Sequence, residues 1–167
     1  MMVTENSQTL KKVSMEVNGS KETIEVDVRD SLLDVLRDTL DLTGPKKGCD
    51  ETVCGACSVL LNGRAICSCT ILAVEADGSK VTTIEGLSKG DDLDPLQKAF
   101  IQHDSLQCGY CTSGQIIAAK SFIDELQGRV PNEEEIKEAL SGNICRCGAY
   151  NNIVDAVAEV AKSRARR

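Results

Sequence analysis

Alternating hydrophobic and polar residues dominate the first part of the chain. Residues 13–17 and 24–28 each place a hydrophobic side chain at every second position. This two-residue period is typical of a strand with one buried face. Asn18 and Gly19 lie between the two runs, and this pair favours the tight turn of a hairpin. The pattern therefore predicts a β-hairpin that packs one face onto a core.

The next segment changes to a helical period. Ser31 and Asp34 are spaced like a capping box, and hydrophobic residues then recur at helical spacing from Leu32 to Leu40. We expect a helix that starts after Ser31 and a segment that ends at Gly44-Pro45, where glycine and proline disfavour helix.

More strands are expected beyond this helix. Residues 59–66 predict a second hairpin that turns at Asn62-Gly63, and residues 71–73 and 81–84 predict two further strands. These elements form a mixed sheet wrapped on one helix, which is the layout of a β-grasp ferredoxin domain. We assign residues 10–86 to this domain.

Helical periodicity replaces the strand pattern after about Gly86. We expect a helix opening at Pro95, another through residues 116–122, a third following Pro131, and a fourth striped by apolar residues between 153 and 160. Each pair of helices brackets one pair of cysteines. Residues 87–167 thus predict an all-α bundle with two-fold pseudo-symmetry, so the expected fold class is α+β with two domains.

Composition and charge narrow the class of protein. The chain has 167 residues, 41% of them hydrophobic, which is enough to bury one core or two small ones. Residues 1–19 contain no apolar run long enough for a signal peptide or a membrane span, so we expect a cytoplasmic protein. A net charge of -7 argues against nucleic acid as a partner. In a reducing compartment, nine cysteines indicate metal or redox chemistry more than disulfides.

The cysteine spacing is the strongest chemical signal. The segment C-x4-C-x2-C, followed by a later cysteine, is the spacing of plant-type 2Fe-2S proteins. The first cysteine group is Cys49, Cys54, Cys57 and a fourth member. The second cysteine group is Cys108, Cys111, Cys145 and Cys147. Two sets of four thiolates predict two 2Fe-2S clusters and an electron-transfer function.

Two questions stay open at the level of spacing. Cys67 and Cys69 are two residues apart on an extended segment and share one face, so spacing does not choose the fourth ligand of the first group. Structural zinc is the main alternative to iron-sulfur clusters, because cysteine pairs separated by a long insert also bind zinc. A freestanding two-cluster ferredoxin and a zinc-stabilised interaction module are therefore the alternative functions.

The surroundings of the cysteines favour added negative charge. Helices beginning near Thr112 and Asn151 are expected to direct their positive N-terminal ends toward the second group. Glycines beside ligand cysteines are expected to let backbone N–H groups approach the sulfur atoms. These glycines are Gly48, Gly55, Gly109 and Gly148.

The motifs resemble those of the small iron-sulfur subunit of the molybdenum hydroxylases, the xanthine oxidase family with its aldehyde oxidoreductases and carbon monoxide dehydrogenases. The likeness extends from about residue 13 to 161. It rests on the segments Gly48-Cys49-Asp50, Val53-Cys54-Gly55-Ala56-Cys57, Gln107-Cys108-Gly109-Tyr110-Cys111 and Gly142-Asn143-Ile144-Cys145-Arg146-Cys147, with Tyr150. The family pattern places the fourth ligand of the first group twelve residues after Cys57, which selects Cys69.

The resemblance also implies partners and a direction. Substrate is expected to be oxidised at a molybdopterin-molybdenum centre on a large subunit, so this chain contributes no catalytic residue of its own. Electrons then enter the second cluster, pass to the first, and leave toward a medium subunit with FAD or another acceptor. The family places Gln107 and Cys147 against the pterin. Because the chain ends at Arg167 without flavin or molybdenum domains, we expect a hetero-oligomer such as a dimer of heterotrimers. The substrate is not readable from this chain.

Overall fold

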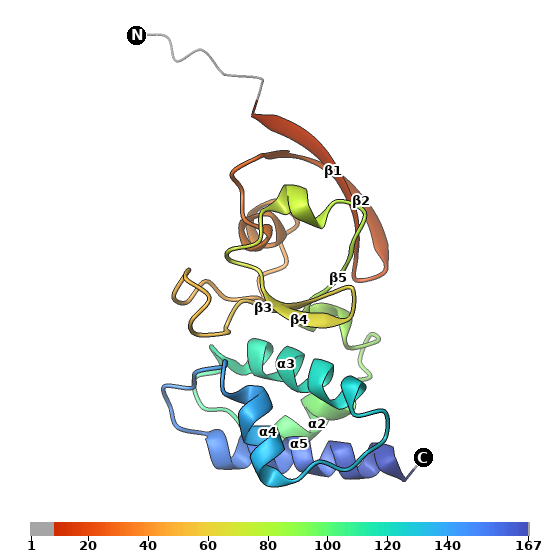
Figure 1. Cartoon of the computed structure of the whole chain (residues 1–167), viewed down its shortest axis with the longest axis vertical. Coiled ribbons are helices and arrows are strands. Elements are labelled where there is room, and N and C mark those ends of the chain that lie inside the picture. The colour runs from red at the N-terminus through yellow and green to blue at the C-terminus, as the bar shows by residue number, and fades with distance from the viewer. Residues whose placement is uncertain (1–8, 167) are drawn as a thin grey trace.

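A mixed five-stranded sheet and a group of helices stacked beneath it make up residues 9–166, the part of the chain that the computed structural model describes (Figure 1). We call Leu10–Gly86 the sheet region and Pro95–Ala165 the helical region. The protein is thus of mixed α+β type, as expected. The described N-terminal strand lies at one end of the long axis and the last helix at the other.

The sheet has the strand order β2-β1-β5-β3-β4. Its strands are β1 (Leu10–Val17), β2 (Ser20–Asp27), β3 (Ser58–Leu61), β4 (Arg64–Cys67) and β5 (Lys80–Thr82). β1 runs parallel to β5, and the other neighbours are antiparallel. Both predicted hairpins are confirmed. Each turns at an Asn-Gly pair with left-handed backbone, φ 51° and 86° at Asn18-Gly19 and the same angles at Asn62-Gly63.

The core of the sheet region follows from the alternation in β1. Val13, Met15 and Val17 are buried on the same face, and the residues between them are exposed or half-buried. They pack with the fully buried Leu32 and Leu36. The helix after Ser31 therefore fills the concave side of the sheet, as the sequence predicts.

That helix is shorter and wider than expected. α1 covers only Leu32–Asp34, and the chain continues as a π-helix, η1 (Val35–Thr39). The Leu40 N–H donates to the carbonyl of Val35, five residues back, at 3.0 Å. The Ser31 cap is present, because the Asp34 N–H donates to Ser31 Oγ at 3.1 Å.

The strand expected over residues 71–73 is wrong. Leu72 forms only an isolated bridge to Ser31, and Ala73–Ala76 is a 3₁₀ turn, η2. Both terminal alanines of η2 are fully buried, so their small side chains let this turn pack under β1. The strand expected over 81–84 is displaced, because β5 ends at Thr82 and a second 3₁₀ turn, η3 (Ile84–Gly86), follows.

The helical region contains the four expected helices. They are α2 (Pro95–Gln102), α3 (Thr112–Glu125), α4 (Glu133–Leu140) and α5 (Tyr150–Ala165). α4 begins at Glu133 after an Asn132 cap, so Pro131 precedes the helix. The fully buried Phe100, Ile136 and Ile153 lie at the centre of this second core.

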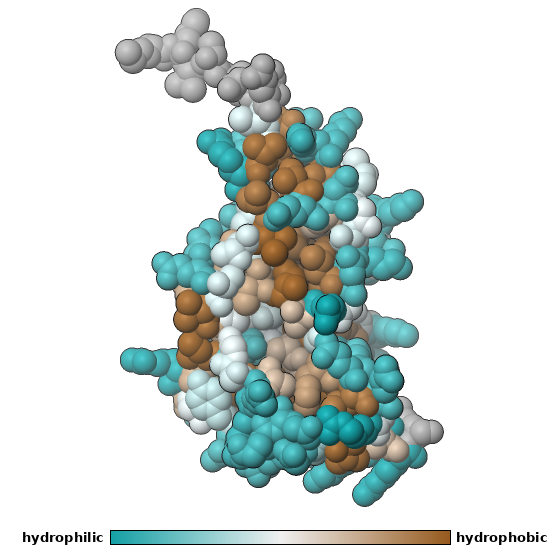
Figure 2. Space-filling model, in the orientation of Figure 1, coloured by the Kyte–Doolittle hydropathy of each residue, from teal (hydrophilic) through white to brown (hydrophobic). Residues whose placement is uncertain are grey.

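Helix α3 joins the two regions. It lies directly beneath β3 and β4 and contacts both strands (Figure 1). On the face shown in Figure 2, apolar side chains run in a band along the middle and hydrophilic ones flank it. Within residues 9–166, no helix is long and apolar enough to cross a membrane. The expectation about a leader concerns residues 1–19, of which 1–8 lie outside the described residues.

Candidate metal centres

Residues 48–57, which we call the first cysteine loop, wrap around the thiol of Cys49. The backbone N–H groups of Glu51, Val53 and Cys54 donate to Cys49 Sγ at 3.4, 3.3 and 3.4 Å. These donors, with Glu51 the strongest, lower the pKa of Cys49 to about 7. The loop therefore favours the thiolate, which is the form that binds metal.

The loop reaches this shape through strained backbone. Asp50 and Thr52 have φ of 62° and 58°. These angles lie in the left-handed region, which residues other than glycine rarely adopt. The N–H of Thr52 partly offsets the rise in pKa that burial causes at Cys69, the cysteine that follows β4. Strained backbone that concentrates N–H donors on sulfur is a feature of functional sites.

The remaining thiols of this group lie deeper. Cys57 and Cys69 are 2% and 8% exposed and pack on Leu33, with Cys67 beside them. A hydrogen bond with Cys67 and then burial raise the pKa of Cys57, and burial raises that of Cys69 to about 11. Both Cys67 and Cys69 therefore approach Cys57. Cys69 is buried, whereas Cys67 is half-buried and lines a cavity between β4, α3 and α4.

The second cysteine group lies where the four helices converge. Cys108 and Cys111 occupy the connection between α2 and α3, and Cys145 and Cys147 occupy the one between α4 and α5. The thiols meet across the two connections, Cys108 with Cys147 and Cys111 with Cys145. The structure thus brings the predicted four residues together.

Backbone dipoles converge on this second group. α3 begins directly after Cys111, and α5 begins at Tyr150, so both positive helix ends adjoin the thiols. Burial would raise the pKa of Cys145, but the N–H groups of Ala149, Cys147 and Gly148 lower it below its usual value. The expected helix N-termini are therefore in place.

The donor sets fit a cluster with four cysteine ligands. All nine cysteines are free thiols. Four thiolates hold a 2Fe-2S cluster with two at each iron. Among residues 9–166, no three or more His, Cys, Asp or Glu side chains are arranged so that they could hold one metal ion. Thiolates also bind zinc, so donor chemistry alone does not distinguish the two metals.

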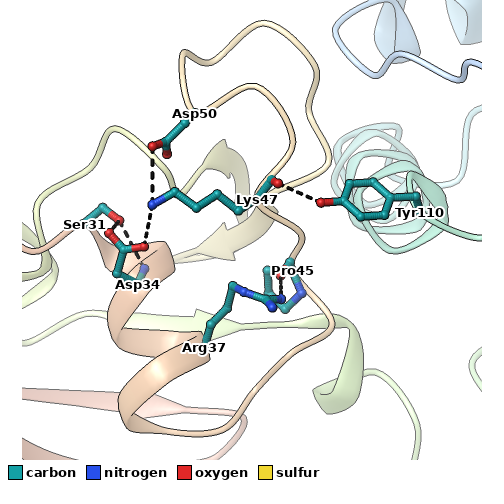
Figure 3. Close-up of polar contacts among 7 residues, drawn as sticks. All are labelled: Ser31, Asp34, Arg37, Pro45, Lys47, Asp50 and Tyr110. Carbon is teal, nitrogen blue, oxygen red and sulfur yellow. Dashed lines mark hydrogen bonds and ion pairs between the residues drawn. The ribbon is translucent and has the colours of Figure 1, made fainter.

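Lys47 and Tyr110 connect the first cysteine loop to both regions (Figure 3). Lys47 Nζ pairs with Asp34 Oδ1 at 2.9 Å and Asp50 Oδ2 at 3.3 Å, while the Lys47 carbonyl accepts from Tyr110 Oη at 2.7 Å. Partial burial would raise the pKa of Asp34, but hydrogen bonds from Lys47 and Ser31 hold it below its usual range. The start of the loop is therefore anchored to α1 on one side and to the second cysteine group on the other.

The far end of the loop meets the second group through the backbone. The Ile144 N–H donates to the Cys54 carbonyl at 2.9 Å, and Ile144 directly precedes Cys145. One hydrogen bond therefore separates a cysteine residue of the first group from a neighbour of the second.

Gln107 lies at the exposed edge of the second group. Its Nε2 donates to the carbonyl of Cys147 at 3.4 Å, and Cys108 beside it is exposed. The two residues predicted to contact a pterin are thus side by side. The same hydrogen bond also fits a loop glutamine that caps nearby backbone.

Tyr110, Gln115 and Asn143 form hydrogen bonds where the two cysteine groups meet, and the sequence did not predict these contacts. Tyr110 and Asn143 were part of recognised motifs without an assigned role, and Gln115 was not singled out. Gln115 and Asn143 are buried, at 1% and 7% exposure. A glutamine directly before Ile116 and Ile117 on a buried helix face was the available signal.

Two family models match the chain. The model described as "2Fe-2S iron-sulfur cluster binding domain" matches residues 15–86, and the one described as "[2Fe-2S] binding domain" matches residues 83–158.

Similar proteins carry related names. The aldehyde oxidoreductase iron-sulfur-binding subunit PaoA of Escherichia coli K12 is 49% identical over 162 residues, covering 89% of this chain and 71% of that protein. The nicotine 6-hydroxylase small subunit of Paenarthrobacter nicotinovorans is 46% identical, covering 93% of each. A chain of quinoline 2-oxidoreductase from Pseudomonas putida 86 superposes with a TM-score of 0.89 at 41% identity, over 95% of this chain and 98% of that one.

Proposed function

Because the chain belongs to the small iron-sulfur subunits of the molybdenum hydroxylases, we propose that it is the electron-transfer subunit of a heteromeric oxidoreductase of this family. Bound 2Fe-2S clusters supply one-electron acceptors and donors. The chain's own contribution is to hold the thiolates, direct N–H groups at them and keep the two groups adjacent.

The observation that carries this proposal is the direct contact between the two cysteine groups. The Cys54 carbonyl and the Ile144 N–H meet at 2.9 Å, and the Tyr110 hydroxyl reaches the Lys47 carbonyl at 2.7 Å. Two separate structural metal sites would not require their ligand segments to touch. In a relay such contact keeps the two clusters close together, and closeness speeds transfer because electron tunnelling weakens steeply with distance.

We assign the first cluster to the three thiols of the first cysteine loop and one thiol beyond β4. We assign the second cluster to the four thiols in the connections between the helices. The support for Cys69 over Cys67 is the family spacing, which places the fourth ligand twelve residues after Cys57, and the burial of Cys69 beside Cys57. The proposed ligands are Cys49, Cys54, Cys57 and Cys69 for the first cluster, and Cys108, Cys111, Cys145 and Cys147 for the second.

We also propose a division into a plant-type β-grasp domain, residues 10–86, and a helical domain with two-fold pseudo-symmetry, residues 87–167. The buried residues support this, since one core spans residues 13–81 and another spans 96–161. Ile84 and Leu87 both pack on the second core, so the change from one core to the other falls between residues 81 and 84, just before the proposed boundary. Residue 167 lies outside the described part of the chain.

The proposed partner on the side of the second cluster is a large subunit with a molybdopterin-molybdenum centre. Apolar side chains surround this edge and are 40–47% exposed, as at Leu106, Tyr150 and Ile144. Such residues suit the core of a protein interface. Gln107 and Cys147 are proposed to contact the pterin there. A medium subunit with FAD, a dimer of heterotrimers and a cytoplasmic location stay predictions from the family and the sequence.

The test is a low-temperature electron paramagnetic resonance spectrum of the anaerobically reduced chain. We expect two distinct signals, each integrating to about one spin per chain. A silent spectrum from protein with filled metal sites would favour zinc and refute the relay.

A second measurement separates a subunit from a freestanding ferredoxin. Affinity purification from the native cell should recover the chain together with a molybdenum-containing chain. Recovery of the chain alone, with both clusters and stable as a monomer, would contradict an obligate complex.

A further inference from the structure

The carbonyl of Gly55 is a junction between the two regions. On the side of the sheet region it accepts from Ser58 N–H at 3.1 Å and from Ser58 Oγ at 2.7 Å, at the start of β3. It also accepts from Asn143 Nδ2 at 3.0 Å, across 88 positions of sequence. Asn143 is buried, so this amide is committed to the contact.

Asn143 is itself held from two sides. The Gln115 Nε2 of α3 donates to the Asn143 carbonyl at 2.9 Å, and the Asn143 N–H donates to the Leu140 carbonyl at 2.9 Å. Gln115 is almost completely buried, which leaves its amide little freedom. A chain of hydrogen bonds therefore runs from α3 through Asn143 to Gly55.

The space around this chain admits no extra atom. A Cβ added to Gly55, whose φ is +69°, would lie 2.5 Å from Asn143 Nδ2 and 2.6 Å from the Gly142 carbonyl. A Cβ added to Gly114, the neighbour of Gln115, would lie 2.2 Å from the Gly55 carbonyl. The backbones approach so closely only because both positions are glycine.

The contact between Asn143 and Gly55 lies next to cysteines of both groups. Gly55 follows the ligand Cys54, and Asn143 lies two residues before the ligand Cys145. The adjacent Ile144 already donates its N–H to the Cys54 carbonyl. The Asn143 side chain thus adds a second hydrogen bond between the two ligand segments, beside that backbone bond.

We propose that Asn143, oriented by Gln115, is a positioning residue that holds the first cysteine loop against the second cysteine group and thereby sets the rate of electron transfer between the two clusters. This inference rests on the proposed relay function. One site is oxidised by one electron as the other is reduced, and a longer gap slows that exchange.

The test compares three substitutions in the full chain with both clusters bound. Asn143→Ala removes the amide, Asn143→Asp keeps its size but replaces the donor with an oxygen, and Gln115→Met removes the donor that orients Asn143. Ser121→Ala is the matched control. It breaks another side-chain bond between the regions, from the Ala65 N–H to Ser121 Oγ at 3.1 Å, and leaves the hydrogen bonds of Asn143 and Gly55 in place.

Two readouts are needed. Amide hydrogen exchange of residues 48–57 reports the mobility of the first cysteine loop whatever metal is bound. The paramagnetic resonance spectrum of the fully reduced protein reports the magnetic interaction between the clusters, and flash reduction measures the transfer rate.

Both Asn143 variants are expected to speed exchange in the loop several-fold, weaken the magnetic interaction and slow the transfer, with a smaller change in the same direction for Gln115→Met. Ser121→Ala should match the unmodified chain. Unchanged exchange and spectra in Asn143→Asp, or equal changes in Ser121→Ala, would overturn the inference. If the unmodified chain lacks 2Fe-2S signals, the proposed function fails, and the exchange data still decide whether Asn143 holds the loop.

Discussion

Replacing Gly114 with alanine tests whether α3 really touches the first cysteine loop. Gly114 is the third residue of α3, and an added Cβ would lie 2.2 Å from the Gly55 carbonyl and 3.1 Å from Ala56 Cα. Both neighbours are backbone, and the carbonyl is fixed by its hydrogen bonds to Ser58 and Asn143. The helix and the loop must therefore separate for the methyl group to fit.

The sign of the change in the free energy of unfolding tests the contact, because Gly114→Ala has two opposing effects: a gain in helix propensity and a steric clash with the loop. Alanine is about 1 kcal/mol better than glycine inside a helix. Forcing an extra methyl group into packed surroundings costs about 1–3 kcal/mol, and a backbone clash this short belongs at the upper end. The expected net loss is about 2 kcal/mol. For a chain of this size, that corresponds to a fall in Tm of about 4–8 °C.

The assay is anaerobic thermal unfolding followed by circular dichroism, with Gly142→Ala as the control. Gly142 has an ordinary φ, and its added Cβ would meet no atom within 4 Å. That variant should unfold within about 0.5 kcal/mol of the unmodified chain. A Tm for Gly114→Ala at or above that of the unmodified chain would refute the close approach of α3 to the loop.

Three other measurements address the site. Cys69→Ser should remove the signal of the first cluster and Cys67→Ser should keep it; the reverse result would exchange their roles. Tyr110→Phe removes the hydrogen bond to the Lys47 carbonyl and should lower the free energy of unfolding by about 1 kcal/mol, measured by urea titration. An unchanged unfolding midpoint would show that this bond does not stabilise the protein in solution. Extracting the metal with a chelator under reducing conditions should speed amide exchange in both cysteine groups but not in the β1–β2 hairpin, whose core contains no cysteine. Equal loss of protection throughout the chain would contradict that separation.

The parts of the fold that follow from local rules were predictable from the sequence. The two hairpins combine alternating hydrophobicity with Asn-Gly turns, and the four later helices have clear periods and starts. The cysteine spacing predicted two groups of thiols but did not choose between Cys67 and Cys69, and the ligand assignment stays a prediction.

The errors arose where tertiary packing decided the local structure. Residues 71–73 are a short hydrophobic run and were predicted as a strand, but the alanines at 73 and 76 are buried and a 3₁₀ turn packs there against β1. The segment after Asp34 has a helical period, yet the chain widens to a π-helix before the left-handed Asp41. Neither the 3₁₀ turn nor the π-helix can be recognised from the spacing of hydrophobic residues in the sequence.

The contacts between the cysteine groups were out of reach for a different reason. Asn143 and Gln115 act on partners far away in sequence, and their acceptors are backbone carbonyls. A carbonyl is present at every residue, so no side-chain pattern marks the position that will be used. Only the folded arrangement identifies it.

In the side-chain hydrogen bonds between the two regions, the side chains come from the helical region and the sheet region contributes backbone atoms. Tyr110, Ser113 and Asn143 contribute side chains, whereas Lys47, Gly44 and Gly55 contribute only their carbonyls. Substitutions in the sheet region that preserve its backbone path therefore leave these partners intact. In evolution, a helical region with these side chains is able to recombine with diverged ferredoxin-like halves, and chimeras of homologous subunits are expected to assemble if they retain glycine at position 55.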